Sequence, residues 1–95
     1  MPVCRRHIMN RALNALLITM LHKKYIGGRH TPEEKLVNSK TKWLQREELV
    51  EFGMEYRQAL NEGLIIRMLK RTGKGSDWHV SLNPRKLKEI YEKIQ

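Results

Sequence analysis

A long amphipathic segment that ends at Gly63 and leads directly into two strand-like runs most constrains how this chain can fold. Within residues 45–62 the apolar side chains recur at steps of three and four, which places them on one side of a helix: Leu49, Phe52, Tyr56, Ala59 and Leu60. Gly63 stands where a helix end favours a residue with positive φ, which glycine adopts without steric penalty. The sequence predicts a helix over about residues 45–62, closed by Gly63.

A glycine inside this segment allows a second interpretation. A break at Gly53 would give two short helices, residues 46–52 and 54–62, arranged as a helix-turn-helix pair. An interior glycine costs about 1 kcal/mol relative to alanine, which packing can offset. Because the apolar register continues through Gly53, we favour one helix.

The two runs that follow have the short apolar stretches and the alternation of strands. The second run alternates between an apolar and a polar face: Trp78, Val80 and Leu82 against His79 and Ser81. The TGKGSD stretch between the runs has turn chemistry and no apolar side chain. These features predict a β-hairpin over about residues 64–82, with Trp78 in the core.

The N-terminal third predicts a further helix over about residues 3–26. Its apolar face is wide: Ile8, Ala12, Ala15, Leu16, Thr19 and Met20, flanked by Leu13, Leu17 and Leu21. So wide a face exceeds what one small core usually needs. This helix is therefore expected either to lie at the centre of the domain or to be partly covered by a second copy.

A short second helix is predicted over about residues 32–38. Thr31 is suited to cap it, Pro32 to occupy its first position and Glu34 to complete a capping box. Two apolar residues of this helix are expected to point inward: Leu36 and Val37.

The last helix is predicted over about residues 84–94, with Asn83 as its cap and Pro84 at its first position. It carries a narrow apolar stripe: Leu87, Ile90, Tyr91 and Ile94. The stripe can pack on its own domain or form a two-fold contact. We expect a homodimer through the N-terminal helix and this C-terminal helix.

Composition points to a nucleic-acid partner. The chain has 95 residues, enough for one domain over residues 1–95, and a net charge of +9 from 19 basic against 10 acidic side chains. Such an excess favours a polyanion, with nucleic acid ahead of an anionic membrane. A single cysteine, Cys4, excludes an internal disulfide and fits a reducing compartment. We expect a cytoplasmic, nucleoid-associated protein, or one in the host cytoplasm if it is viral, and no membrane partner.

The order of these elements resembles the winged helix-turn-helix superfamily over roughly residues 8–82: helix, short Gly-containing connection, capped helix, turn, long helix, basic hairpin. The resemblance implies an α+β, mainly α fold, here with a C-terminal helix after the wing. It also implies a sequence-specific protein that binds double-stranded DNA and regulates transcription as a homodimer.

Basic residues gather where such a protein would contact phosphates. The turn before the long helix, and that helix itself, contribute five groove candidates: Lys40, Lys42, Gln45, Arg46 and Arg57. The hairpin contributes four backbone contacts: Arg67, Lys70, Arg71 and Lys74. Trp43, in the basic turn, is equally suited to stack on bases or to pack.

The long helix also carries five glutamates against its two arginines: Glu47, Glu48, Glu51, Glu55 and Glu62. Such acids are unfavourable near phosphates. We favour entry of the helix into the groove by its N-terminal end only. Two alternatives stay open. A glutamate reads a cytosine amino group, or the helix does not face nucleic acid and its acids pair with basic residues of the first helix or of a partner.

Catalysis is not expected. Cys4 and His7 are two potential metal ligands where a zinc site needs three or four, and no nucleophile lies beside a base. We therefore expect no enzyme, no metal and no cofactor. Two other functions fit the same chain: a winged-helix protein-interaction module of a larger assembly, and an RNA-binding or ribosome-associated module.

Overall fold

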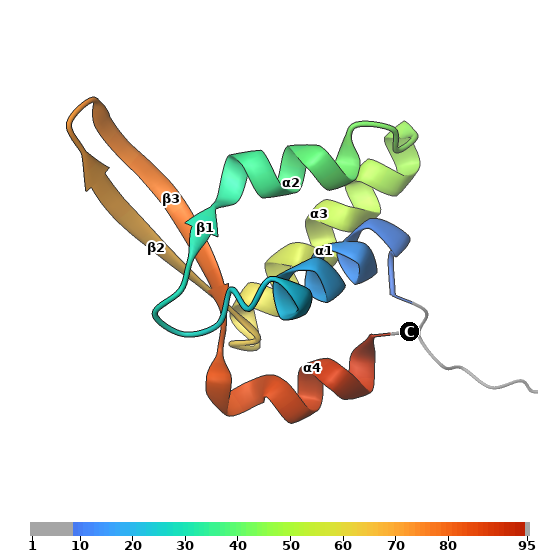
Figure 1. Cartoon of the computed structure of the whole chain (residues 1–95). Helices are drawn as coiled ribbons and strands as arrows, with labels where there is room; N and C mark the ends of the chain where they lie inside the picture. Colours follow the sequence, from blue (N-terminus) through green and yellow to red (C-terminus); the bar gives the residue numbers. More distant parts are fainter. Residues whose placement is uncertain (1–8, 95) are drawn as a thin grey trace, which may run out of the picture.

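A computed structural model describes residues 9–94, which form four α-helices and a small antiparallel sheet (Figure 1). In chain order the elements are α1 (Arg11–His22), β1 (Thr31–Pro32), α2 (Glu33–Thr41), α3 (Arg46–Asn61), β2 (Ile65–Thr72), β3 (Gly75–Leu82), the 3-10 turn η1 (Pro84–Lys86) and α4 (Leu87–Lys93). The helices gather on one side, and the β2–β3 hairpin projects away from them as a finger (Figure 1). An α+β, mainly helical fold is therefore confirmed.

The sheet has the strand order β1-β3-β2. Strands β2 and β3 pair from Ile65↔Leu82 at the base to Thr72↔Gly75 at the tip, so the connecting loop has only two residues. The predicted hairpin is confirmed, but most of the stretch expected to be turn is strand. The two-residue strand β1 pairs with the middle of β3.

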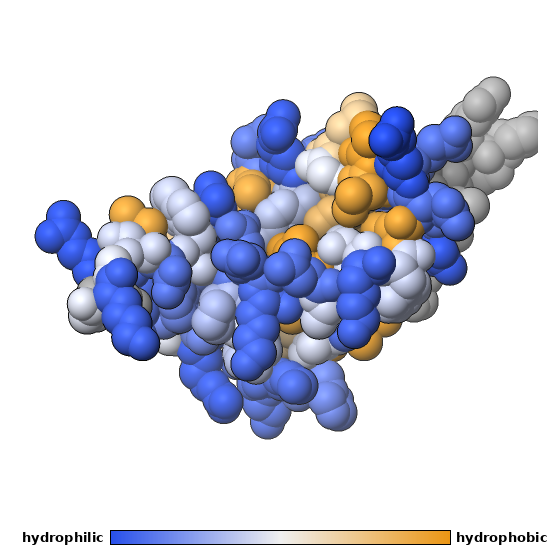
Figure 2. Space-filling view, turned by 90° about the horizontal axis from the view of Figure 1, so that it is seen from above, coloured by the Kyte–Doolittle hydropathy of each residue, from blue (hydrophilic) through white to orange (hydrophobic). Residues whose placement is uncertain are grey.

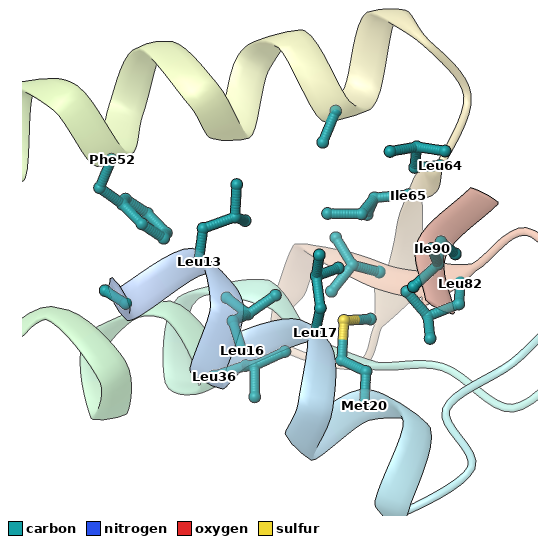
Figure 3. Packing of buried hydrophobic residues seen from close by; sticks show 13 residues of the cluster. Leu13, Leu16, Leu17, Met20, Leu36, Phe52, Leu64, Ile65, Leu82 and Ile90 are labelled. Carbon is teal, nitrogen blue, oxygen red and sulfur yellow. The ribbon is translucent and has the colours of Figure 1, made fainter. Parts of the chain in front are cut away.

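Helix α1 lies at the centre of the core. Its buried side chains, including Leu13, Leu17 and Met20, meet residues from every other helix and from the hairpin (Figure 3). Phe52 comes from α3 and Ile90 from α4. The wide apolar face of this helix is thus explained by its central position within one domain.

Helix α1 is shorter than predicted. Asn10 caps it, because its side chain accepts hydrogen bonds from the N–H groups of Ala12 and Leu13. At the other end Lys24 takes a left-handed conformation, with φ +60°. The Tyr25 N–H then donates to the Met20 carbonyl at 2.9 Å, which closes the helix before Gly27. Residues 3–8 of the predicted helix lie outside the described residues.

The predicted Thr31 cap of the second helix is wrong. Thr31 and Pro32 pair with β3, so α2 begins at Glu33 with no side-chain cap. Sheet pairing outcompetes the local capping box here. The helix extends to Thr41, beyond its predicted end at residue 38.

Helix α3 is a single helix that passes through Gly53, as favoured, and Gly63 has the expected positive φ, +78°. Leu49 was expected to face inward, but it is 47% exposed. Ser81 was expected on the outer face of β3 and is instead fully buried.

Asn83 joins three parts of the chain. Its side-chain amide donates to the Gly63 carbonyl at 2.9 Å, and its backbone N–H donates to the Leu64 carbonyl at 3.0 Å. Its side-chain oxygen accepts from the Arg85 N–H, which confirms it as the predicted cap of the last helical segment. The end of α3, the base of the hairpin and the start of the last helical segment therefore meet at one residue.

Candidate nucleic-acid interface

The nine predicted contact residues fall in two main groups at the two ends of α2. The hairpin continues from the β1 side of α2, and the α2–α3 turn follows its other end (Figure 1). Lys40 is half-buried. The other eight side chains are exposed: Lys42, Gln45, Arg46, Arg57, Arg67, Lys70, Arg71 and Lys74. Seen from above, the hairpin end is largely hydrophilic, whereas hydrophobic residues gather towards the other end (Figure 2).

Arg67 is already engaged within the protein. Its Nε donates to both carboxylate oxygens of Glu33 at 3.0 Å. Its guanidinium carbon also lies 4.0 Å from the ring centroid of Trp78. Arg67 therefore links the hairpin to α2 through Glu33. Lys70, Arg71 and Lys74 lie further towards the tip of the hairpin.

The expectation that Trp78 belongs to the core is wrong. Trp78 is 43% exposed and stacks on Arg67 at the outer half of β3. Strand alternation continues beyond the edge of the helical body, so the apolar face of β3 is buried only near its base, at Val80 and Leu82.

Glu33 fixes the hairpin relative to α3. Besides Arg67, its Oε2 accepts a hydrogen bond from the Tyr56 hydroxyl at 2.7 Å. Burial, and then the Glu33 hydrogen bond, raise the pKa of Tyr56 far above its usual range, so the hydroxyl stays protonated and keeps donating. Sequence reasoning missed this cluster, because its members are 23 and 34 residues apart and share no local pattern.

Three of the glutamates on α3 are turned towards the start of α1. Arg11 donates to Glu48 at 2.9 Å, and this contact, with the Gln45 N–H, lowers the pKa of that carboxyl. Asn10 donates from its backbone to Glu55 and from its side chain to Glu51, both at 2.8 Å. One α3 acid, Glu48, therefore pairs with a basic residue of the first helix, whereas Glu51 and Glu55 are bound by the neutral Asn10. Which way α3 faces nucleic acid stays a prediction.

The arginines of α3 occupy a different flank. Arg46 and Arg57 are separated from the Asn10-bound glutamates by the helical rotation between their positions. At the N-terminal end, Trp43 is 56% exposed, with the Arg11 guanidinium carbon 5.5 Å from its ring centroid. Whether Trp43 stacks on bases remains a prediction.

Two histidines meet where the sheet leaves the helical body. Nδ1 of His30 and Nδ1 of His79 are 2.8 Å apart, so one ring donates a proton that the other accepts. Burial, followed by the charges of His30 and Lys70, lowers the pKa of His79, and Asp77 opposes this effect. Within residues 9–94 no three His, Cys, Asp or Glu side chains cluster as metal ligands. Cys4 and His7, considered above as potential metal ligands, lie outside this range.

No helix in the described part of the chain is both long and apolar enough to cross a membrane. Comparisons with protein-family models, curated proteins and solved structures found no match to this chain.

Proposed function

We propose that this protein is a winged helix-turn-helix protein that binds double-stranded DNA in a sequence-specific way and regulates transcription. The observation that carries the proposal is the projecting hairpin, whose outer half exposes Lys70, Arg71 and Lys74. A projecting basic finger on a chain of net charge +9 is suited to lie along a phosphate backbone, because each contact releases counterions.

The start of α3 supplies the second half of the proposed contact. Lys42, Gln45 and Arg46 are exposed there, where the positive end of the helix dipole also favours phosphate. The acids nearest to α1 are held by Asn10 and Arg11. This arrangement supports entry of the α3 N-terminus, with the arginine flank leading, into a major groove.

The last helix leaves little apolar surface for the predicted homodimer. Ile90 is fully buried in its own core, and Leu87 and Ile94 pack against it. Tyr91, 61% exposed, is the member of the stripe that remains for a partner. A two-fold dimer on half-sites about one helical turn apart therefore depends on Tyr91 in this proposal.

A protein-interaction module is the second candidate, favoured by exposed apolar residues on α3. Leu49, Val50 and Met54 are 47%, 59% and 68% exposed. Apolar side chains exposed together on one helix are a common feature of protein contacts. A regulator that also binds a protein through α3 is compatible with both candidates.

The test is a comparison of two triple-alanine variants that each remove three positive charges. Lys70, Arg71 and Lys74 are replaced in the hairpin, and Arg85, Lys88 and Lys93 in the matched control. Binding to duplex DNA, structured RNA and single strands is measured across a range of salt. The hairpin variant is expected to bind duplex DNA more weakly, with a slope of log K against log salt that is less steep by up to about 3.

The control variant should keep the wild-type slope. An unchanged slope in the hairpin variant would remove the hairpin from the interface. Absence of duplex binding by the wild-type protein near physiological salt would favour the protein-interaction module, and preference for structured RNA would favour the RNA-binding alternative.

A further inference from the structure

An open groove between α1 and α2 combines an apolar floor with basic walls. Ile18, 40% exposed, and the nearly buried Leu36 supply apolar surface. Basic side chains from both helices line it: His22, Lys23, Lys35 and Lys40. The lining formed by the described residues contains no acidic side chain. The groove therefore suits an occupant that is both apolar and acidic.

The outer surface of α3 has the opposite character. A shallow hollow there is lined by Glu47, Glu51 and Glu55 around the apolar side chains of Val50 and Met54. Glu51 and Glu55 accept hydrogen bonds from Asn10, but an amide is neutral and leaves their negative charge in place. Val50 and Met54 are the most exposed apolar side chains on this helix. We call this surface the acidic flank of α3.

The two surfaces cannot meet within one molecule. Helix α3 packs on α1 through Phe52 and Ala59, and three members of its acidic flank are exposed to solvent without a bond to Asn10: Glu47, Val50 and Met54. Helix α2 lies on a different side of α1, as Figure 3 shows. The groove and the acidic flank of one copy therefore point in different directions.

We propose that the acidic flank of α3 in one copy docks into the α1–α2 groove of the next copy. Met54 and Val50 would lie over Ile18, while Glu47 and Glu51 would face Lys23 and Lys35. The contact joins two different patches, so each added copy leaves one groove and one flank unused. Association of this kind is head-to-tail and continues into a chain or closes into a ring.

The contact uses no residue of the basic hairpin, although Lys40 lines the groove and Glu47 adjoins Arg46. A copy bound to DNA through the hairpin would still offer its groove or its acidic flank to the next copy. The inference does not depend on DNA binding, because both surfaces belong to the protein alone.

The experiment uses two variants, each of which disables one surface. The groove variant is Ile18→Ser with Lys35→Glu, and the flank variant is Glu47→Gln with Met54→Ser. All four side chains are exposed, so both variants should fold, which thermal melting followed by circular dichroism checks. Lys40 is left unchanged because it belongs to the predicted DNA contacts.

Sedimentation velocity at low salt, without DNA, is the measurement. The wild-type chain should form species larger than a dimer as its concentration rises, and high salt should dissolve them. Each variant alone should associate at least about tenfold more weakly, equivalent to about 1.4 kcal/mol. An equimolar mixture should form a one-to-one heterodimer and nothing larger, because the intact flank of one variant fits the intact groove of the other.

Tyr91→Ser separates this contact from a two-fold dimer. The substitution should leave head-to-tail association unchanged, and its loss would overturn the inference in favour of the two-fold dimer. A wild-type chain that stays monomeric at low salt, or a variant mixture without heterodimer, would also overturn it. Dissolution of the assembly by a short duplex would assign the groove to nucleic acid. The outcomes measured without DNA do not depend on whether the hairpin binds DNA.

Discussion

Glu33 shows how one side chain can set the geometry of a candidate interface. It accepts hydrogen bonds from Tyr56 on α3 and from Arg67 on β2, and Arg67 in turn lies on Trp78 of β3. The carboxylate of Glu33 therefore links α2, α3 and the hairpin. The direction in which the finger projects is expected to depend on this cluster.

The Tyr56→Phe variant tests that dependence. Loss of the hydroxyl removes a 2.7 Å hydrogen bond to Glu33 and should lower the free energy of unfolding by about 1 kcal/mol. Urea unfolding measures the effect. Tyr91→Phe is the matched control, because Tyr91 is 61% exposed, and it should change stability little. Equal losses in the two variants would contradict the role of the cluster.

The His30–His79 pair predicts a pH dependence of stability. The folded pKa of His79 lies below its ordinary value of about 6.5, so the unfolded chain binds the proton more readily. The free energy of unfolding should therefore fall as the pH drops from about 7 through 6.5 and flatten once His79 is protonated in the folded state.

His79→Gln should make this pH dependence shallower, whereas His22→Gln, at an exposed position, should leave it as in the wild type. Chemical denaturation at several pH values gives both curves. A wild-type stability that is constant over this range would refute the prediction.

Contacts between residues far apart in the chain could not be predicted from the sequence, for a physical reason. The alternation in β3 predicts which side chains share a face. It does not predict where along the strand the helices stop covering that face. Trp78 was assigned to the core for that reason, although it lies past the edge. Glu33 and Arg67 are brought together by the pairing of β1 with β3, which no local pattern records.

Among the secondary-structure elements, α3 and the glycine that ends it were predicted best. Its apolar spacing extends over about three turns, and Gly63 has the expected left-handed conformation. The hairpin was predictable because alternation and turn residues are local signals. The ends of α1 and α2 were not, because Lys24 closes α1 without a glycine and the sheet takes Thr31.

Gly53 within α3 and Gly63 after its end should respond in opposite ways to replacement by alanine. A Cβ at Gly53 meets no atom within 4 Å, so Gly53→Ala should stabilise the protein by about 0.5–1 kcal/mol. Gly63 has φ +78°, so Gly63→Ala should destabilise it by about 1–2 kcal/mol. Thermal or urea unfolding measures both, and effects of the same sign would contradict the assigned conformations.

For the molecule as a whole, the important feature is the separation between a buried base and an exposed finger. Ile65, Val80 and Leu82 anchor the hairpin in the core, whereas Leu69 and Trp78 are 53% and 43% exposed. The sequence identified which segments carry the basic residues. It did not show that the segments lie at the two ends of α2, since that depends on how the elements pack.

Shortening the finger should therefore separate folding from binding. Deleting the pairs Lys70↔Asp77 and Arg71↔Ser76 keeps the two-residue loop and preserves the alternation of faces. Stability should change by less than about 1 kcal/mol, because no core residue is removed. Duplex binding at low salt should weaken at least about tenfold.

A lengthened hairpin is the control for that deletion. Repeating the same two pairs adds length while retaining the basic charge, so duplex binding should persist. Unfolding of the shortened protein would show that the finger stabilises the body, and unimpaired duplex binding would show that it makes no contact with DNA.

The position of Asn83 affects how this protein can be made in a cell. Residue 83 closes contacts to Gly63 and Leu64, and β3 supplies the pairing partner for both other strands. A nascent chain paused on the ribosome before Gly75 has α1 and α3 but lacks β3 and α4, which cover them. Its apolar surfaces stay exposed until β3 and α4 have been synthesised, so chaperone engagement with this domain should be concentrated before that point.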